Sequence, residues 1–411
     1  MFRTAISLMA YAIFLVSCGN NATTSSSAEN AADSTSNPPV ETQAANTSYP
    51  PAFVGQTRIA GVKTNTAWEG TVISKDLIKP WGLVGLPDGR LLITEKAGTM
   101  RIATAAGQLS PAITGLPKVD STGQGGLLGV TIDPEFASNR MVYWSFSERS
   151  AGGTVTAIGK GALSADEKTI QNAVVIYRAT PAYDGDKHYG GRVVFDAAGN
   201  LMISTGERSD LVTRPQAQDT KSGLGKIIRI TKEGQPAADN PFKDSTGYRP
   251  EIFSYGHRNP QGLAVHPVTK EVWNSEMGPR GGDEINVVKA GVNYGWPTIT
   301  YGIEYTGEKI NNGKTKQEGL QQPVYYWDPV LSPSGMTFYN GDNMPEWKNN
   351  LFIGGLSSKH IARLVIENNK VTGEERLLEN EGQRFRDVAQ GTDGILYAIT
   401  DEGRLYRIAK K

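Results

Sequence analysis

The sequence predicts an all-β protein folded as a six-bladed β-propeller. Two observations lead to this prediction: a strand, a tight turn and a second strand recur six times along the chain, and no long amphipathic helix interrupts them. The 411 residues also include 47 glycines spread along the chain, a composition typical of a turn-rich β protein. A large irregular β-sandwich is the alternative architecture for such a pattern.

Each copy of this motif begins with a small or apolar stretch, passes through a turn and continues as an alternating strand. The six copies pair residues 81–84 with 88–93, 126–130 with 141–144, 191–195 with 199–203, 261–265 with 271–273, 334–338 with 350–353, and 386–389 with 393–397. They recur about every 55 residues, a spacing that fits propeller blades with loop insertions. In a propeller, the loops that leave the inner strands surround one mouth of a central channel, so residues far apart in sequence meet there.

The N-terminal residues predict export and a lipid anchor. Arg3 precedes a short, mostly apolar run over residues 5–16, and Ser17 stands directly before Cys18, the single cysteine of the chain. This order resembles a bacterial lipoprotein signal, which is cleaved before the cysteine that carries the lipid. An ordinary signal peptide with a coincidental cysteine is the alternative. We expect a periplasm-facing protein anchored to the cell envelope, and Gly19 favours the outer membrane.

Composition also sets the expected domain boundaries. Residues 1–17 form the signal peptide, and residues 18–56 are rich in Asn, Ser, Thr and Ala with few large apolar side chains. Such a segment buries too little surface to offset the entropy of ordering it, so we expect a disordered tether. The propeller should span residues 57–411. The formal charge is zero and no basic stripe is present, which argues against nucleic acid as a partner.

The stretch 251–297 contains two polar, glycine- and proline-rich loops separated by two short apolar runs. The first loop reads Gly-His-Arg-Asn-Pro over 256–260, and the second reads Gly-Pro-Arg-Gly-Gly-Asp-Glu over 278–284. Loops held by a compact hairpin more often serve a site than a core. The stretch therefore predicts a functional site.

Three motifs in this stretch resemble the soluble quinoprotein glucose dehydrogenases and the related aldose sugar dehydrogenases, which use pyrroloquinoline quinone (PQQ). The motifs occupy residues 256–262, 276–286 and 293–297. The resemblance extends over residues 75–408 and implies the same six-bladed propeller. It also implies PQQ- and calcium-dependent oxidation of the C1 hydroxyl of an aldose sugar to the lactone, with electrons passing to an acceptor that the sequence does not identify.

His188, in Asp-Lys-His-Tyr-Gly-Gly-Arg over 186–192, is the candidate general base. Dehydrogenating a sugar hydroxyl requires a group that takes the O–H proton, and imidazole suits this task. Without the resemblance, a loop histidine is more often a surface residue; with it, His188 is the catalytic base and a cofactor contact. We expect an apparent pKa of roughly 6–7. Lys187, which stands where the glucose dehydrogenases carry an aspartate, would lower it by repulsion.

Arg258 and Asn259 are candidate cofactor contacts in the first loop. A cation and an amide suit the stabilisation of negative charge on a quinone oxygen, which gives Arg258 a catalytic role as well. A turn that caps backbone carbonyls is the alternative. His257, His266 and His360 are expected to be structural.

The resemblance implies further contacts with cofactor and substrate. Gln124 matches a family residue near both the sugar and PQQ. Arg384 and Arg386 flank Phe385 and should therefore point to one side of a strand, where their guanidinium groups would suit the three carboxylates of PQQ. A solvated strand face is the alternative for the two arginines. Lys359 is a candidate for the lysine that the family supplies from its fifth blade, although its segment aligns imperfectly.

The second loop is the expected metal site. The resemblance implies that the backbone carbonyls of Gly278 and Pro279 bind calcium, which prefers hard oxygen ligands. Asp283 is a candidate substrate contact; a second ion or the backbone of the loop itself are alternatives for Asp283 and Glu284. No Gly-x-Gly-x-x-Gly opens a strand-to-helix turn and no Cys/His cluster occurs, so nicotinamide, zinc, iron–sulfur and haem chemistry are unsupported.

Two other functions are compatible with a propeller of this kind. One is a non-catalytic module that binds a glycan or a protein, and the other is a calcium-dependent hydrolase of the lactonase type. A binding module would need no base at position 188, and an arginine pair fits a tricarboxylate better than a lactone. The sugar itself stays open among glucose, other aldoses and sorbosone.

Overall fold

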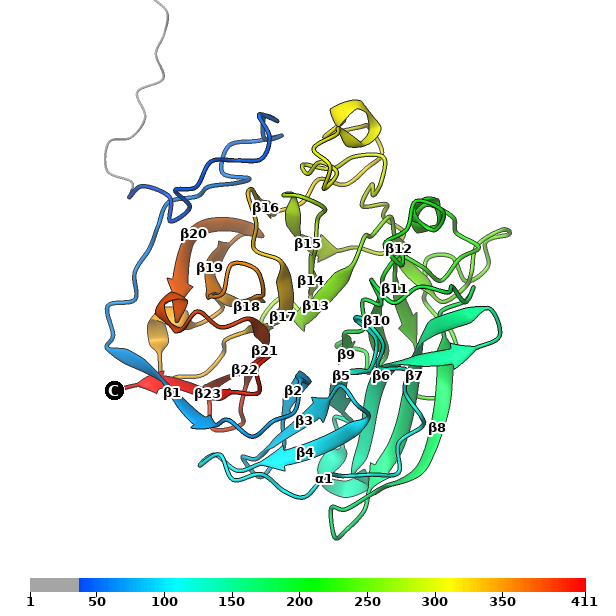
Figure 1. Ribbon diagram of the computed structural model, residues 1–411, viewed down its shortest axis with the longest axis vertical. Helices are drawn as coiled ribbons and strands as arrows, with labels where there is room; N and C mark the ends of the chain where they lie inside the picture. The colour runs from blue at the N-terminus through cyan, green and yellow to red at the C-terminus, as the bar shows by residue number, and fades with distance from the viewer. Residues whose placement is uncertain (1–36) are drawn as a thin grey trace, which may run out of the picture. The chain divides into compact units, whose positions relative to one another are not determined.

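Six antiparallel sheets stand in a ring in the computed structural model, which describes residues 37–411 (Figure 1). Five of the sheets have four strands and one has three. The predicted six-bladed β-propeller is therefore confirmed. The two segments of each predicted repeat overlap the two innermost strands of one blade.

The strands run outward from the centre of the ring in five blades. These are β2 (Pro80–Gly85), β3 (Leu91–Glu95), β4 (Thr99–Ala103); β5 (Leu127–Ile132), β6 (Met141–Ser150), β7 (Gly153–Leu163), β8 (Ile170–Arg178); β9 (Val193–Phe195), β10 (Leu201–Thr205), β11 (Lys226–Ile230), β12 (Ile252–Tyr255); β13 (Pro260–Val265), β14 (Val272–Glu276), β15 (Asp283–Val288), β16 (Tyr325–Trp327); and β17 (Pro333–Phe338), β18 (Leu351–Gly355), β19 (Ile361–Glu367), β20 (Lys370–Leu377). The described helices are short: α1 (Phe136–Asn139), and the 3₁₀ turns Arg214–Ala217, Ile310–Gly313, Pro345–Trp347 and Glu379–Glu381.

The sixth blade joins the two ends of the propeller. It contains β21 (Phe385–Gln390), β22 (Leu396–Thr400) and β23 (Leu405–Lys410), and its outer strand is β1 (Trp68–Ser74) from the start of the propeller. β1 pairs antiparallel with β23, from Trp68 opposite Lys410 to Ser74 opposite Leu405. Because the first strand completes the last blade, the ring has no open end that could splay apart.

The innermost strands also contact one another around the ring, in the order β2, β5, β9, β13, β17, β21 and back to β2. Each blade buries both of its faces against its neighbours, so alternate residues of a strand enter different cores. Leu201 and Ile203 pack with Tyr143 on one side of β10, whereas Met202 packs with Leu263 on the other side. This two-sided burial accounts for the continuous apolar runs in the inner strands.

Residues 37–56 differ from the predicted tether. They belong to the same unit as the blades and lie beside the blade of β16 (blue in Figure 1). The backbone N–H groups of Asn46 and Thr47 donate to the Asp328 carboxylate at 2.8 and 3.1 Å, and Gln56 Nε2 donates to Pro323 O at 3.0 Å. Hydrogen bonds thus order a segment that lacks an apolar core, and composition alone misplaced the boundary at residue 57.

Other N-terminal predictions concern residues that the structure does not describe. The signal peptide over 1–17, Cys18 and the tether up to residue 36 lie outside the described residues. Within residues 37–411, no helix is both long and apolar enough to cross a membrane.

Removing the Asp328 carboxylate should loosen the segment 37–56. Asp328 is buried, and its Oδ2 also accepts a bond from Thr47 Oγ1 at 3.1 Å. Asp328→Ala leaves these donors without their partner, so it should cost about 1–3 kcal/mol in urea unfolding and expose residues 37–56 to limited proteolysis. The matched control is Asp342→Ala, which removes only an exposed pair with Lys348 and should change neither measurement. Equal behaviour of the two variants would contradict this account of the segment.

Candidate active site

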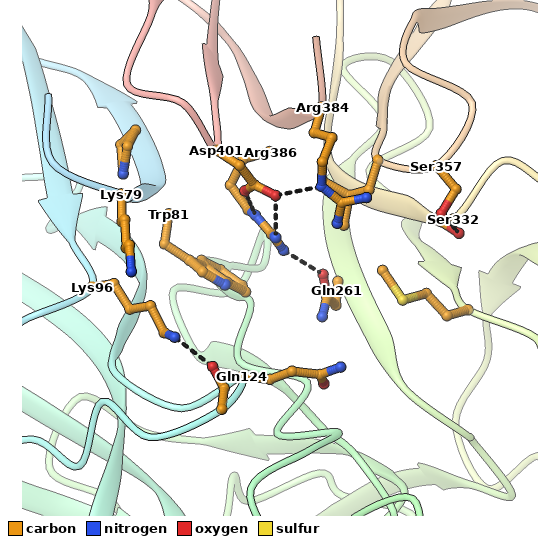
Figure 2. Close-up of a pocket in the computed structure, with 14 residues that line it drawn as sticks. Lys79, Trp81, Lys96, Gln124, Gln261, Ser332, Ser357, Arg384, Arg386 and Asp401 are labelled. Carbon is orange, nitrogen blue, oxygen red and sulfur yellow. Dashed lines mark hydrogen bonds and ion pairs between the residues drawn. The ribbon is translucent and has the colours of Figure 1, made fainter.

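A cavity of about 440 Å³ opens where loops from several blades converge (Figure 2). Its lining comes from residues at the ends of inner strands, as the propeller prediction requires. The polar lining residues are Lys79, Lys96, Gln124, Gln261, Ser332, Ser357, Arg384, Arg386 and Asp401, with Trp81, Leu356 and Met277 among the apolar ones. Of the residues predicted for the site, Gln124, Arg384 and Arg386 line this cavity directly.

Arg384 directly precedes β21, and its side chain points to the same side as that of Arg386, as the sequence predicts. Phe385 between them is fully buried. Asp401 lies between the two guanidinium groups: its Oδ2 is 2.8 Å from Arg384 Nε, and its Oδ1 is 2.7 Å from Arg386 Nε. Arg386 Nη1 also donates to Gln261 Oε1 at 3.1 Å. Although burial raises the pKa of Asp401, the two arginines lower it below its usual value. Asp401 thus holds both cations in place without neutralising them fully.

The sequence did not reveal Asp401, although the hairpin register contains the signal. Phe385 pairs with Thr400, so the residue after Thr400 stands beside Arg384, and the Asp401 N–H donates to Arg384 O at 3.0 Å. Lys359, in contrast, is exposed and is not among the residues that line the cavity. Its backbone turns at a φ of 58°, and Leu356 and Ser357 occupy that part of the lining. The lysines that do line it, Lys79 and Lys96, come from the blade of β2 instead.

His188 is buried next to this cavity. Its Nδ1 is 2.6 Å from Glu207 Oε1, and its backbone N–H donates to Gln124 Oε1 at 2.9 Å. Nε2 has no hydrogen-bond partner among residues 37–411, so it is the nitrogen available to a ligand. The carboxylate at Nδ1 favours the tautomer that carries its proton there and leaves Nε2 as an acceptor. Glu207 was not predicted, and its position shortly after β10 gave no distinguishing sequence signal.

The pKa of His188 is lower than the sequence predicts. Burial, together with the positive charge of Arg258, lowers it to about 4, although Glu207 opposes the shift. Arg258 therefore takes the repulsive role that we expected of Lys187, whose side chain is exposed. At neutral pH the imidazole is uncharged, which is the state a proton acceptor needs.

Arg258 and Asn259 are buried on the side of the site next to Met277, which lines the cavity. Arg258 Nη1 donates to the carbonyls of Met277 and Gly278 at 3.0 and 2.5 Å, and its buried Nε has no partner within residues 37–411. Asn259 Oδ1 accepts the N–H of Gly190 at 3.0 Å, which fixes the chain just after His188. Neither residue lines the large cavity itself.

The loop that begins at Gly278 is shaped by Asp283. Asp283 is buried; its Oδ1 accepts the Gly278 N–H at 2.9 Å, and its Oδ2 accepts the N–H groups of Leu331 and Ser332 at 2.8 and 2.7 Å. All its strong bonds go to backbone groups and it does not line the cavity, so the structure does not support the predicted contact with substrate. Its role is to hold the loop, which was one of the alternatives.

Oxygen atoms are abundant around this loop. Met277 O and Gly278 O already converge on a cationic donor, and the carboxylates of Glu276 and Glu284 lie around a small cavity beside them. Burial and the charge of Glu276 raise the pKa of Glu284 well above its usual value. No group of three or more His, Cys, Asp or Glu side chains that could hold a metal occurs within 37–411. A cation here would need backbone carbonyls, and these fit the hard-oxygen preference of calcium.

The other three histidines have structural surroundings, as predicted. His257 bonds to Ser254 Oγ and Glu276 at 2.9 and 3.0 Å, and His266 Nδ1 accepts two backbone N–H groups. His360 directly precedes β19 and its Nδ1 is 3.1 Å from Ser358 O.

The fold and the site define a propeller enzyme with a buried His–Glu pair beside a cation-lined cavity. The chain belongs to the glucose/sorbosone dehydrogenase family, whose sequence profile matches residues 77–407. It is thus an oxidoreductase of the quinoprotein sugar dehydrogenase type.

Individual relatives cover most of the chain. Aldose sugar dehydrogenase YliI of Escherichia coli (strain K12) is 44% identical over 345 residues, which are 83% of this chain and 92% of the relative. The apo crystal structure of the soluble aldose sugar dehydrogenase from Escherichia coli superposes with a TM-score of 0.80 at 43% identity, covering 84% of this chain and all (100%) of that one. A PQQ-bound aldose sugar dehydrogenase from Streptomyces coelicolor superposes with a TM-score of 0.69 at 29% identity. The match covers 84% of this chain and 99% of that one.

The His188–Glu207 pair can be tested without any ligand. In ¹⁵N-labelled protein at pH 7, His188 should carry its proton on Nδ1 and titrate with a midpoint near 4. Glu207→Gln removes a negative charge that raises this pKa, so the midpoint should fall further. Its amide can also donate to Nδ1 and reverse the tautomer. A midpoint at or above the ordinary value of about 6.5 in the wild type would contradict the burial argument.

Proposed function

We propose that this protein oxidises the C1 hydroxyl of aldose sugars to the lactone, using PQQ and calcium, with His188 as the general base. The observation that carries the proposal is the neutral, Glu207-bound imidazole of His188 next to a cavity lined by lysines and arginines. A non-catalytic binding module would have no use for a buried imidazole held at Nδ1 with Nε2 free.

The cavity suits PQQ in charge. It is lined by four cationic side chains and one carboxylate, and PQQ carries three carboxylates that arginine and lysine bind well. Arg384, Arg386 and Gln124 would hold the cofactor from the cavity wall, and Arg258 and Asn259 from the side of Met277. When bound, PQQ supplies the two-electron acceptor for the hydride that leaves the sugar C1.

Calcium would be held by the carbonyls of Gly278 and Pro279. Support for this site comes from the carboxylates of Glu276 and Glu284, which line a small cavity together with Gly278, and from Asp283, whose Oδ1 accepts the Gly278 N–H and fixes the loop. Calcium bound beside the cofactor supplies a hard positive charge there.

The protein's own part in the reaction is to move one proton and to hold the reactants. Nε2 of His188 accepts the C1 hydroxyl proton as hydride departs, and Glu207 stabilises the imidazolium that forms. Gln124 uses its Oε1 to fix the His188 backbone, so its amide Nε2 stays available to the sugar or the cofactor. Arg258 offers positive charge to the oxygen that becomes negative.

Substituting His188 tests whether it moves the proton while other residues hold the cofactor. His188→Gln should keep PQQ and calcium binding close to that of the wild type, because Arg384, Arg386 and Gln124 are the residues proposed to hold the cofactor from the cavity wall. Loss of general-base assistance should lower the rate of dye reduction about 10²–10⁴-fold across a panel of sugars. In the wild type, kcat/KM should stay level down to about pH 5 and fall with a midpoint near 4, because only the neutral imidazole accepts a proton.

Cofactor binding and activity of His188→Gln, measured together, show whether His188 is the base or shapes the pocket. If His188→Gln loses cofactor and activity together, the residue shapes the pocket instead. If it keeps both, the base is another group. A wild-type protein that binds no PQQ in the presence of calcium would refute the proposed function as a whole.

We further propose that the enzyme faces the periplasm on a lipid anchor at Cys18, supported by the signal-like order of residues 3–18. Cys18→Ser should release a soluble and still active enzyme in cell fractionation. Unlipidated wild-type protein in the soluble periplasmic fraction would contradict the anchor.

A further inference from the structure

The cavity contains two cations for which the family resemblance gave no role. Lys79 lies directly before β2, and Lys96 lies directly after β3, so both enter the site from the same blade (Figure 2). Neither ammonium group forms an ion pair with a carboxylate of residues 37–411, whereas Arg384 and Arg386 share Asp401. These lysines therefore form a second, unpaired cationic wall of the cavity.

The backbone holds Lys96 firmly in this wall. Its N–H donates to Lys79 O at 3.1 Å and its carbonyl accepts the Leu127 N–H at 2.9 Å. The side chain of Lys96 packs directly against Gly126. A Cβ at position 126 would lie 2.4 Å from Lys96 Cγ, so only glycine leaves room for it there. The ammonium group reaches the carbonyl of Gly123, next to Gln124. Lys96 is thus directed along the loop that carries a predicted cofactor contact, and not out into solvent.

The charges of the lining remain unbalanced without a ligand. Lys79, Lys96, Arg384 and Arg386 face a single carboxylate, Asp401, among the lining residues. Burial, followed by repulsion from Lys79 and Arg386, lowers the pKa of Lys96, and the attraction of Asp401 and Asp186 offsets this only in part. Four positive charges against one negative charge leave a net charge of three, which equals the number of carboxylates on PQQ.

We propose that Lys96, assisted by Lys79, binds a carboxylate of PQQ, and that this pair does the work that the resemblance assigned to Lys359. The proposal rests on the proposed function, because it presumes that PQQ is the ligand of this cavity. Arg384 and Arg386 on one wall of the cavity, and the two lysines on the other, would then bind different carboxylates of one rigid molecule. Lys96 is the main contact because it is partly buried and anchored, whereas Lys79 is exposed and adds long-range attraction.

The test is a PQQ titration of the full chain in calcium buffer, followed by calorimetry. Lys96→Met should weaken binding between about tenfold and about a hundredfold, the range of one charge-assisted hydrogen bond. Lys79→Met should weaken it by a few-fold, and Lys96→Arg should restore most of the affinity. Lys359→Met tests the rival lysine and Lys75→Met, at another exposed position, controls for the loss of one charge; both should bind as the wild type does.

A thermal melt without cofactor separates binding from folding. Removing Lys96 relieves like-charge repulsion, so the Tm of Lys96→Met should equal or exceed that of the wild type. If methionine prevents folding, Lys96→Gln keeps a donor for Gly123 O and should show the same loss of affinity.

The outcomes are distinct for the two proposals. A wild type that does not bind PQQ refutes the proposed function. A wild type that binds PQQ, together with unchanged affinity in both Lys96→Met and Lys96→Gln, overturns the role of Lys96. A large loss in Lys359→Met alone would return that role to the fifth blade.

Discussion

The pairing of β1 with β23 is the constraint on which the rest of the structure depends. It makes the first strand of the propeller the outer strand of its last blade, and the ring of inner strands closes from β21 back to β2. Ring closure brings Lys79 and Lys96, from the first blade in sequence, to the same cavity as Arg384 and Asp401 from the last. Without it, the two cationic walls would belong to opposite ends of an open array.

Electrostatics then decides what the cavity can accept. Asp401 holds two arginines side by side, but the cavity as a whole keeps an excess of positive charge. Beside it, burial and Arg258 keep the imidazole of His188 neutral, while Glu207 fixes its orientation. A positive cavity attracts a polyanionic cofactor, and a neutral imidazole can accept a proton. The two features depend on different charged residues, so they can be tested by separate variants.

The sequence predicted the parts of this arrangement that repeat. Inner strands such as Leu201–Thr205 are buried on both faces, so they are recognisable in the sequence as short apolar runs bounded by turns. The common direction of Arg384 and Arg386 follows from the alternation of a strand. These predictions need only local geometry, and the structure confirms them.

Predictions that depend on long-range partners could not be made from the sequence. Glu207 and Arg258 set the pKa of His188, but only the folded chain brings them to it. Asp283 looked like a substrate contact because it is an acid in a polar loop; in the structure its oxygens bind backbone N–H groups of Leu331 and Ser332. Residues 37–56 looked disordered because their composition lacks apolar side chains, whereas Asp328 supplies the hydrogen bonds that order them.

The central claim is that hydride leaves the sugar C1 while His188 takes the hydroxyl proton. The most direct measurement is a single-turnover experiment on the PQQ- and calcium-loaded enzyme, which compares a sugar deuterated at C1 with the ordinary sugar. The account predicts slower reaction of the deuterated sugar in the wild type, and an isotope effect that persists in His188→Gln at a much lower rate. Equal single-turnover rates for the two sugars, unchanged by His188→Gln, would contradict it.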